Sequence, residues 1–279
     1  MRNIDRETVE GFGDEWTRFD QSELDDAERR EMFETYFAVF PWELAGPDAV
    51  GFDAGCGSGR WAAIVASRVG KLHAVDASEA ALTVARRNLR NAANVELHCA
   101  SVDDLPFADG SMDFGYSLGV LHHVPDTAEA IHSCARKLKR GAPFLVYLYY
   151  AFDNRPRWFQ MVWRLSDLGR RVISRMPHAM RFVASQTLAI SVYWPLARSA
   201  NVLERLGVHV DDIPLSTYRD RSFYVMRTDA LDRFGTRLEQ RFTRDQIRSM
   251  METAGLERVT FSAAPPFWCA VGYKAGAAA

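Results

Sequence analysis

The stretch Asp53-Ala54-Gly55-Cys56-Gly57-Ser58-Gly59 decides how the rest of the sequence is interpreted. It follows a short apolar run and precedes a segment with helical periodicity that begins at Trp61. A strand, three alternate glycines and a helix place a bare backbone at a helix N-terminus, where a ligand can approach closely. Several classes of α/β enzyme use this glycine spacing, so the spacing alone does not identify the ligand.

The residues around the glycines distinguish two classes of ligand. A dinucleotide fingerprint requires a third small residue at position 60, where this chain has Arg60. Asp53 would repel a diphosphate, but it would attract a ligand that carries an α-ammonium and a sulfonium group. The loop therefore favours S-adenosylmethionine (SAM). Asp76 ends the next predicted strand, and its carboxylate can accept both hydrogen bonds of a ribose diol.

Short apolar runs alternate with helical patterns from residue 49 onward. The predicted strands are 49–54, 72–75, 95–99, 112–118, 144–149, 259–262 and 269–273. The predicted helices between them are 61–68, 78–89, 126–139 and 244–253, with Ser78, Asp126 and Thr243 at their starts. This rhythm predicts an α/β fold: a doubly wound, mostly parallel seven-stranded sheet with helices on both faces.

The same patterns divide the chain into three regions. Residues 1–48 are rich in acidic and aromatic side chains, and we expect an N-terminal helical lid with a helix over 25–39. Residues 49–150 and 228–279 form the predicted SAM-binding domain. Residues 151–227 form a predicted helical cap insertion that would carry substrate specificity. Its first part, residues 151–206, has nine arginines, no lysine and three acids.

The positive excess of this insertion has several interpretations. Guanidinium groups suit a phosphate or carboxylate on the substrate. A solvated cap, a homodimer surface and docking on an anionic membrane are alternatives.

Composition excludes several functional classes. A net charge of −2 argues against a nucleic-acid partner. The longest apolar stretch, residues 188–197, is too short for an integral membrane segment, and the N-terminus lacks the apolar core of a secretory signal. The four cysteines are scattered, which fits a cytoplasmic protein. We expect no metal site, because no set of histidine and carboxylate ligands appears in the sequence.

Four motifs together resemble those of class I SAM-dependent methyltransferases, especially the methyltransferase type 11 group of quinone and sugar methyltransferases. They are residues 53–59, Asp76, residues 101–107 and residues 117–126. The resemblance implies a site that binds the methionine part, the ribose and the adenine of SAM, built from Asp53, Gly55, Gly57, Gly59, Asp76, Ser101, Val102 and, through its backbone, Leu118. Many relatives carry aspartate where this chain has Ser101.

Two histidines follow the fourth predicted strand. With an intrinsic pKa near 6.5, the imidazole of His122 or His123 could take a proton from a substrate hydroxyl; a hydrogen-bonded structural role is the alternative. Asp153 is a further candidate for the base or for a group that orients it. We expect substrate contacts from Trp16, Tyr150, Tyr218 and Arg219.

These residues predict transfer of the SAM methyl group to an oxygen of a small metabolite, a sugar or a natural product that is anionic or apolar. C-methylation of a quinone, isoprenoid or other lipid-like acceptor is the alternative. A nicotinamide oxidoreductase and a SAM-binding module without catalysis are the other classes considered.

Overall fold

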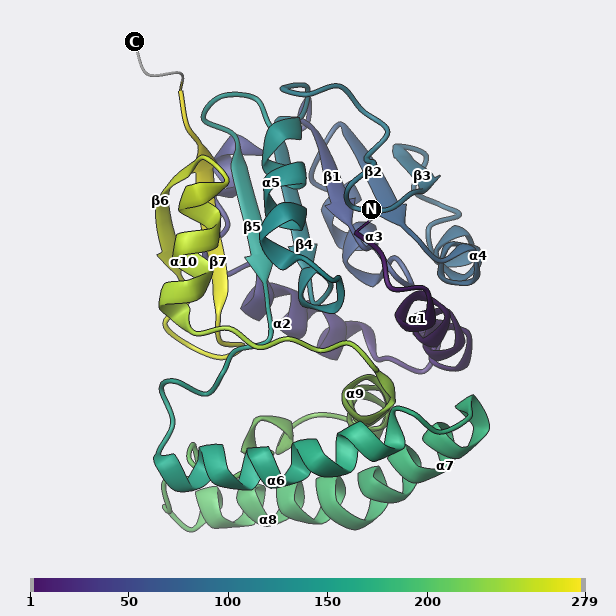
Figure 1. Cartoon of the computed structure of the whole chain (residues 1–279), viewed down its shortest axis with the longest axis vertical. Coiled ribbons are helices and arrows are strands. Elements are labelled where there is room, and N and C mark those ends of the chain that lie inside the picture. Colours follow the sequence, from purple (N-terminus) through teal and green to yellow (C-terminus); the bar gives the residue numbers. More distant parts are fainter. Residues whose placement is uncertain (1–2, 277–279) are drawn as a thin grey trace. The chain divides into compact units, whose positions relative to one another are not determined.

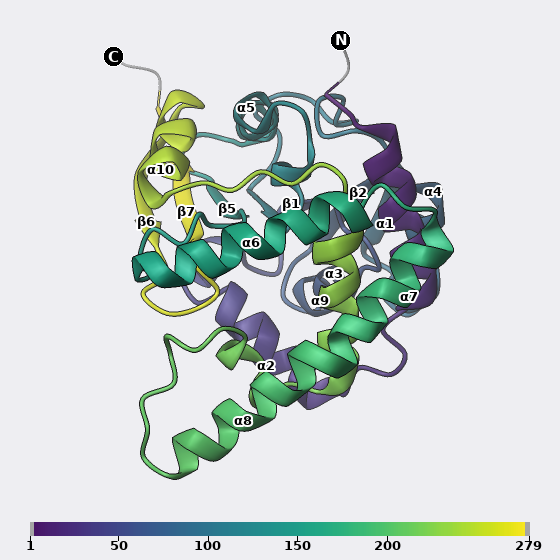
Figure 2. The ribbon, with the colours of Figure 1, turned by 60° about the horizontal axis from the view of Figure 1, so that its bottom comes forward.

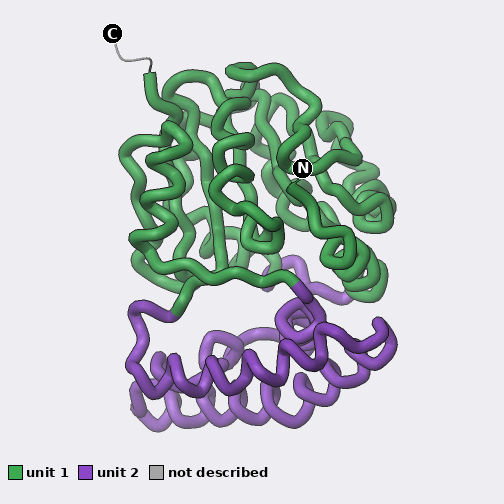
Figure 3. Tube along the Cα trace, in the orientation of Figure 1, with its two compact units in different colours: residues 1–20, 29–151, 238–279 green, residues 21–28, 152–237 purple. Residues whose placement is uncertain are grey.

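The computed structural model describes residues 3–276 and contains two compact units (Figure 3). The first unit includes the chain up to residue 20, residues 29–151 and the chain from 238 onward; the second includes residues 21–28 and 152–237. The expected boundary at 227 is not where the units divide, because the helix Phe223–Gly235 runs across that position. Nor does the N-terminal region form a body of its own, since its residues are shared between both units.

A seven-stranded sheet in the order β3-β2-β1-β4-β5-β7-β6 forms the centre of the first unit (Figure 1). Its strands are β1 (Val50–Ala54), β2 (Lys71–Asp76), β3 (Val95–Cys99), β4 (Phe114–Leu118), β5 (Pro143–Tyr147), β6 (Leu256–Phe261) and β7 (Cys269–Lys274). Strands β1 to β5 pair in parallel, and β7 is antiparallel to both of its neighbours. The predicted mostly parallel α/β fold is confirmed. The strand order reverses between β1 and β4, so the glycine loop lies at the switch point where such sheets bind ligands.

Side-chain caps begin several of the helices around this sheet. The helices of the unit are α1 (Arg6–Arg18), α2 (Asp26–Tyr36, which begins in the second unit), α3 (Arg60–Ala66), α4 (Glu79–Asn88), α5 (Thr127–Lys137) and α10 (Arg244–Thr253), with short 3-10 turns η1 (Trp42–Leu44) and η2 (Leu121–His123). Ser78, Asp126 and Thr243 cap α4, α5 and α10 as predicted. The sequence did not predict α1.

Helices α5 and α10 cover one face of the sheet and lie in front of it in Figure 1. Their buried Ile131 and Ile247 belong to the same core as Phe52 of β1 and Phe144 of β5. The opposite face is covered by aromatic side chains that follow α2. Phe37 packs edge-on to Tyr116, with ring centroids 5.2 Å apart. Both faces of the sheet are therefore buried, as parallel sheets require.

Two phenylalanines and two glycines interlock between β1 and β4. The strands pair Gly51 with Phe114 and Phe52 with Gly115. A methyl group added to Gly51 would lie 2.2 Å from the Phe114 ring, and one added to Gly115 would lie 2.3 Å from the Phe52 ring. Each glycine therefore makes room for the ring on the neighbouring strand.

The second unit is helical, with α6 (Arg157–Ile173), α7 (His178–Leu188), η3 (Ala189–Tyr193), α8 (Trp194–Arg205), η4 (Ser216–Tyr218) and α9 (Phe223–Gly235). Its own core includes Tyr193, Met226 and Ala230. Helix α7 continues through the π-helical turn η3 into α8 (Figure 2), and Pro195 lies in the first turn of α8.

Several arginines of the insertion have structural partners. Arg170 donates to Asp167 at 2.6 Å and to the Thr236 carbonyl at 3.1 Å. Arg198 donates to the carbonyls of Arg219 and Arg221. Guanidinium groups bridge two acceptors in this way more readily than ammonium groups do. This explains the preference for arginine without invoking an anionic substrate.

One face of α6 is apolar and exposed. Six of its side chains are between 45% and 65% exposed: Trp158, Met161, Val162, Leu165, Leu168 and Val172. An exposed apolar row of this kind is typical of interaction surfaces. Among the described residues, no helix combines the length and hydropathy needed to cross a membrane.

Candidate active site

The glycine loop between β1 and α3 has a backbone that favours glycine at three positions. Gly55, Gly57 and Gly59 have φ angles of 88°, 53° and 76°. Neighbouring side chains also leave little space there. A methyl group on Gly55 would lie 2.4 Å from Val120, and one on Gly57 would lie 2.7 Å from the Trp16 indole. Glycine is therefore required for both backbone conformation and packing.

Asp53, at the end of β1, is a buried carboxyl group only 2% exposed. Burial raises its pKa from 3.8 to about 8; the Tyr116 hydroxyl lowers it in part, and the charge of Asp76 raises it. Its Oδ2 atom has no hydrogen-bond partner within residues 3–276. A buried acceptor without a partner is destabilising, so a cationic donor at this point would be stabilised.

Asp76, at the end of β2, holds the glycine loop. Its Oδ2 atom accepts a hydrogen bond from the Gly57 N–H at 2.9 Å, and its Oδ1 atom accepts one from the Ser78 N–H at 2.8 Å. Burial raises the pKa of Asp76, and these N–H groups lower it in part. Each carboxylate oxygen has two lone pairs, so both retain capacity for a ribose diol.

The loop after β3 contains an internal hydrogen bond that the sequence did not predict. The Ser101 hydroxyl donates to Asp103, so it can serve a ligand only as an acceptor. This is compatible with an adenine amine, which is a donor. Val102 is buried in the core, and we expect it to contact a ligand through its backbone.

The end of β4 borders open space beside the glycine loop. Leu118 is half-buried at this end. Gly119 follows with a φ of 77°, and apart from its chain neighbours no atom of residues 3–276 lies within 4 Å of the position that its Cβ atom would take. The next residue, Val120, contacts Gly55. The loops after β1 and β4 thus meet where a ligand can be held between them.

Helix α1 contacts the loops that surround this space. Trp16 packs on Gly57, and Gly13 is so close to Ser78 that an added methyl group would lie 2.7 Å from its hydroxyl oxygen. Phe12 packs edge-on to His123, with ring centroids 4.9 Å apart. Trp16, expected to bind substrate, therefore lies against the cofactor loop.

Asn3 joins the start of the chain to two of these loops. Its N–H donates to Asp103 at 2.9 Å. Its side-chain amide donates to the Asp126 carbonyl at 2.6 Å and accepts from the Asp126 N–H at 2.8 Å. Sequence analysis missed Asn3, because an isolated asparagine near a chain end carries no motif.

His122 and His123 are both buried within η2. Neither ring nitrogen of His122 has a hydrogen-bond partner in the described part of the chain. Burial, His123 and Arg241 lower the pKa of His122 well below 6.5. His123 differs, since its Nδ1 atom lies 2.7 Å from the Leu238 carbonyl oxygen. The His122 ring is therefore neutral at pH 7, and within residues 3–276 neither of its nitrogens is engaged in a hydrogen bond.

The aromatic neighbour of His122 is Tyr149, not Tyr150. The rings of His122 and Tyr149 lie 3.9 Å apart, and the Arg241 guanidinium lies 5.0 Å from the Tyr149 ring. Tyr150 instead packs on Phe267, with ring centroids 5.7 Å apart. The expected substrate contact was Tyr150, because alternation along a strand does not reveal which ring borders a site.

The remaining predicted site residues belong to the second unit. Asp153 is exposed there. The Tyr218 hydroxyl donates to Asp229 at 2.8 Å. Arg219 donates to Glu204 at 2.7 Å, and this hydrogen bond raises the Arg219 pKa further. Tyr218 and Arg219 thus have partners within their own unit.

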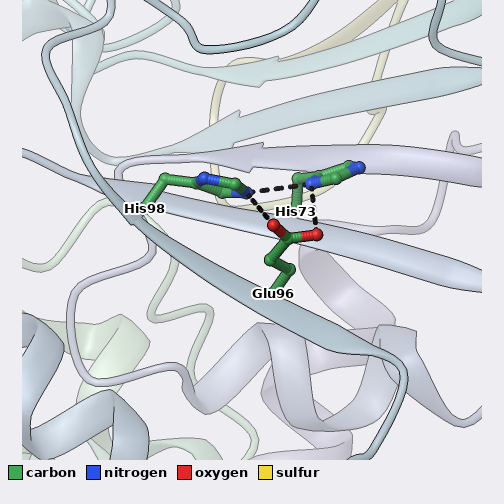
Figure 4. A group of neighbouring side chains, drawn as sticks. All are labelled: His73, Glu96 and His98. Carbon is green, nitrogen blue, oxygen red and sulfur yellow. Dashed lines mark hydrogen bonds and ion pairs between the residues drawn. The ribbon is translucent and has the colours of Figure 1, made fainter.

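A group of potential metal ligands corrects the expectation that no such set exists. His73, Glu96 and His98 offer ligand atoms that all lie within 4.8 Å of one another (Figure 4). They are up to 25 positions apart in sequence. Pairing between β2 and β3 brings them together, and the sequence analysis did not consider this register.

The residues around the switch point fit SAM. The unpartnered Asp53 oxygen suits its α-ammonium group, Asp76 suits the ribose, and the Cβ position of Gly119 is open. These individual contacts remain predictions.

Comparisons with known proteins agree with this fit. Residues 52–146 match the family model described as a methyltransferase domain. A ubiquinone biosynthesis O-methyltransferase of Hahella chejuensis is 29% identical over 75% of this chain and 86% of that protein. One of Alkalilimnicola ehrlichii is 40% identical over 32% of this chain and 37% of that protein, so the chain spans well under half of this second relative.

The fold also occurs in a solved structure described as a possible exported protein from Bordetella parapertussis. It has a TM-score of 0.52 at 16% identity, covering 88% of this chain and 68% of that one. This similarity concerns the fold alone. The sequence match, the glycine loop, the buried Asp53 and the half-buried Asp76 together identify the cofactor as SAM. The chain therefore carries a class I SAM-dependent methyltransferase domain.

Proposed function

We propose that this enzyme transfers the SAM methyl group to a hydroxyl oxygen of a small metabolite. The supporting observation is His122, a buried and neutral imidazole without a hydrogen-bond partner in residues 3–276, just after β4. A neutral imidazole can accept a proton. The names of the O-methyltransferase relatives agree with an oxygen acceptor.

The proposed mechanism is an in-line displacement. SAM supplies an electrophilic methyl group on a sulfonium sulfur. The acceptor oxygen forms a bond to the methyl carbon as the carbon–sulfur bond breaks, and S-adenosylhomocysteine leaves. His122 takes the hydroxyl proton, with His123 as the other candidate base. Most of the rate comes from holding the donor and acceptor in line, and the base adds about 10²- to 10⁴-fold.

One observation supports an acceptor with an aromatic or apolar part. The Tyr149 ring borders His122. Arg219, expected to bind an anionic group, is paired with Glu204. We therefore propose a phenolic or otherwise apolar natural product as the methyl acceptor in preference to a sugar. C-methylation of a quinone or isoprenoid is the second candidate, because an electron-rich carbon needs no base before the methyl group arrives.

A methyl-transfer assay with labelled SAM and a panel of phenols, sugars and isoprenoids tests this proposal. We expect O-methylation of a phenol, with His122→Gln lowering kcat at least about 100-fold while affinity for S-adenosylhomocysteine stays unchanged. His132→Gln, on α5, is the matched control. Full turnover by a protein lacking both His122 and His123 would instead indicate carbon as the acceptor.

A further inference from the structure

The first unit contains a second cluster of chemically active side chains, on β2 and β3. Strand pairing places His73 opposite Glu96, and His98 lies two residues further along the same strand, so the three side chains share one face of the sheet. The side chains of His73 and His98 are 12% and 18% exposed, whereas that of Glu96 is 51% exposed. The three side chains point toward one another in Figure 4.

The distances within this cluster match those of a metal centre. The His73 Nδ1 atom lies 2.9 Å from the His98 Nε2 atom. Glu96 oxygens lie 3.7 Å from the former and 3.9 Å from the latter. Zinc–ligand bonds of about 2.0–2.1 Å in a tetrahedron place neighbouring ligand atoms roughly 3.3 Å apart. The two Glu96 distances are to different oxygens, and one oxygen of Glu96 and the two nitrogens all lie within 4.8 Å of one another, so an ion fits after side-chain rotations.

We propose that His73, Glu96 and His98 bind one divalent transition-metal ion of the zinc class, with water as the remaining ligand. Two imidazoles and a carboxylate are ligands typical of such ions, whereas Mg²⁺ and Ca²⁺ prefer oxygen atoms alone. The ion ties the edge strand β3 to β2. It thereby steadies the loops that carry Asp76 and Ser101, which follow these strands, and it takes no part in methyl transfer.

The Lys71 ammonium group would compete with a metal ion for the Glu96 carboxylate. Its ammonium group lies 2.7 Å from a Glu96 oxygen, so an incoming ion must displace or share this ion pair. The pair is about half exposed and therefore weak. Removing the Lys71 charge should tighten metal binding, a result that a simple hydrogen bond between the two histidines would not produce.

The test uses the untagged full chain after chelator treatment. Zn²⁺ uptake is measured by calorimetry, and Co²⁺ is followed by the absorption of its low-symmetry complexes. We expect one ion per chain, a rise in melting temperature on the order of 5 °C at saturation, at least tenfold weaker binding in His98→Gln, and tighter binding in Lys71→Gln. His209→Gln controls for adventitious binding, since this histidine is exposed in the second unit.

Two results would overturn the proposal. One is stoichiometric uptake that His98→Gln leaves unchanged; the other is no uptake by either the natural chain or Lys71→Gln. If His98→Gln fails to fold, as judged by circular dichroism, His73→Gln and the gain expected from Lys71→Gln still decide the question. None of these results depends on the methyl acceptor.

Discussion

Asp53 should release a proton when the cofactor binds. With a pKa of about 8, this carboxyl group is about 90% protonated at pH 7 in the cofactor-free protein. An ammonium group beside Oδ2 favours the ionised form and lowers the pKa. Binding at pH 7 should therefore release close to 0.9 proton per site.

The release of a proton on binding determines how the affinity for the ligand changes with pH. Affinity for S-adenosylhomocysteine, which keeps the α-ammonium group, should rise with pH by nearly tenfold per unit between about pH 6 and 7. The rise should slow as the pH approaches 8, because more of the Asp53 carboxyl groups are then already ionised in the cofactor-free protein.

Calorimetry in phosphate and Tris buffers at four pH values between 6 and 7.5 measures both quantities. The variant Asp53→Asn, nearly isosteric but unable to ionise, should bind more weakly at pH 7.5 and show neither the proton release nor the slope. If Asp53→Asn still released a proton, the titrating group would be elsewhere, with Asp76 the first candidate. Proton-neutral binding by the natural chain would refute the reasoning.

Three further outcomes follow from the structure. Gly115→Ala forces a methyl group into the Phe52 ring and should lower the free energy of unfolding by about 1–3 kcal/mol in denaturant melts, whereas Gly46→Ala, with open space around it, should have little effect. Asn3→Ala loses two side-chain hydrogen bonds and should weaken S-adenosylhomocysteine binding about fivefold in titrations. Because the folded-state pKa of Asp53 exceeds its unfolded value, the folded state holds an extra proton between about pH 4 and 8. The cofactor-free melting temperature should therefore fall as pH rises across that window, and Asp53→Asn should flatten the fall.

Local signals were sufficient to predict most of the sheet and its helices. The strand Val95–Cys99 and the helix Arg244–Thr253 have the predicted bounds, because alternation, caps and a glycine stop act within a few residues. The glycine loop could also be predicted, because its three positive φ angles favour glycine, the residue found at all three positions.

Features set by register or by distant packing could not be predicted in this way. His73 and Glu96 meet only because β2 and β3 pair in one particular register. Helix α1 has only three large apolar side chains, Val9, Phe12 and Trp16, and contacts such as that between Trp16 and Gly57 hold it in place. Tyr149 and Tyr150 are adjacent in sequence, and only the fold determines which ring lies beside His122.

The structure also changes the electrostatic argument for the cofactor. A permanent negative charge at Asp53 would attract a cation and repel a diphosphate at any pH near 7. A buried carboxyl group with a pKa of about 8 is instead mostly uncharged at pH 7 until the cation arrives. Desolvation therefore keeps the cofactor-free site neutral, and ionisation accompanies binding. Two features then select against a diphosphate. Arg60 stands where a dinucleotide fingerprint needs a small residue, and a diphosphate would leave the Asp53 carboxyl group without a partner. This selectivity should grow as the pH approaches 8, because more of the Asp53 carboxyl groups are then ionised.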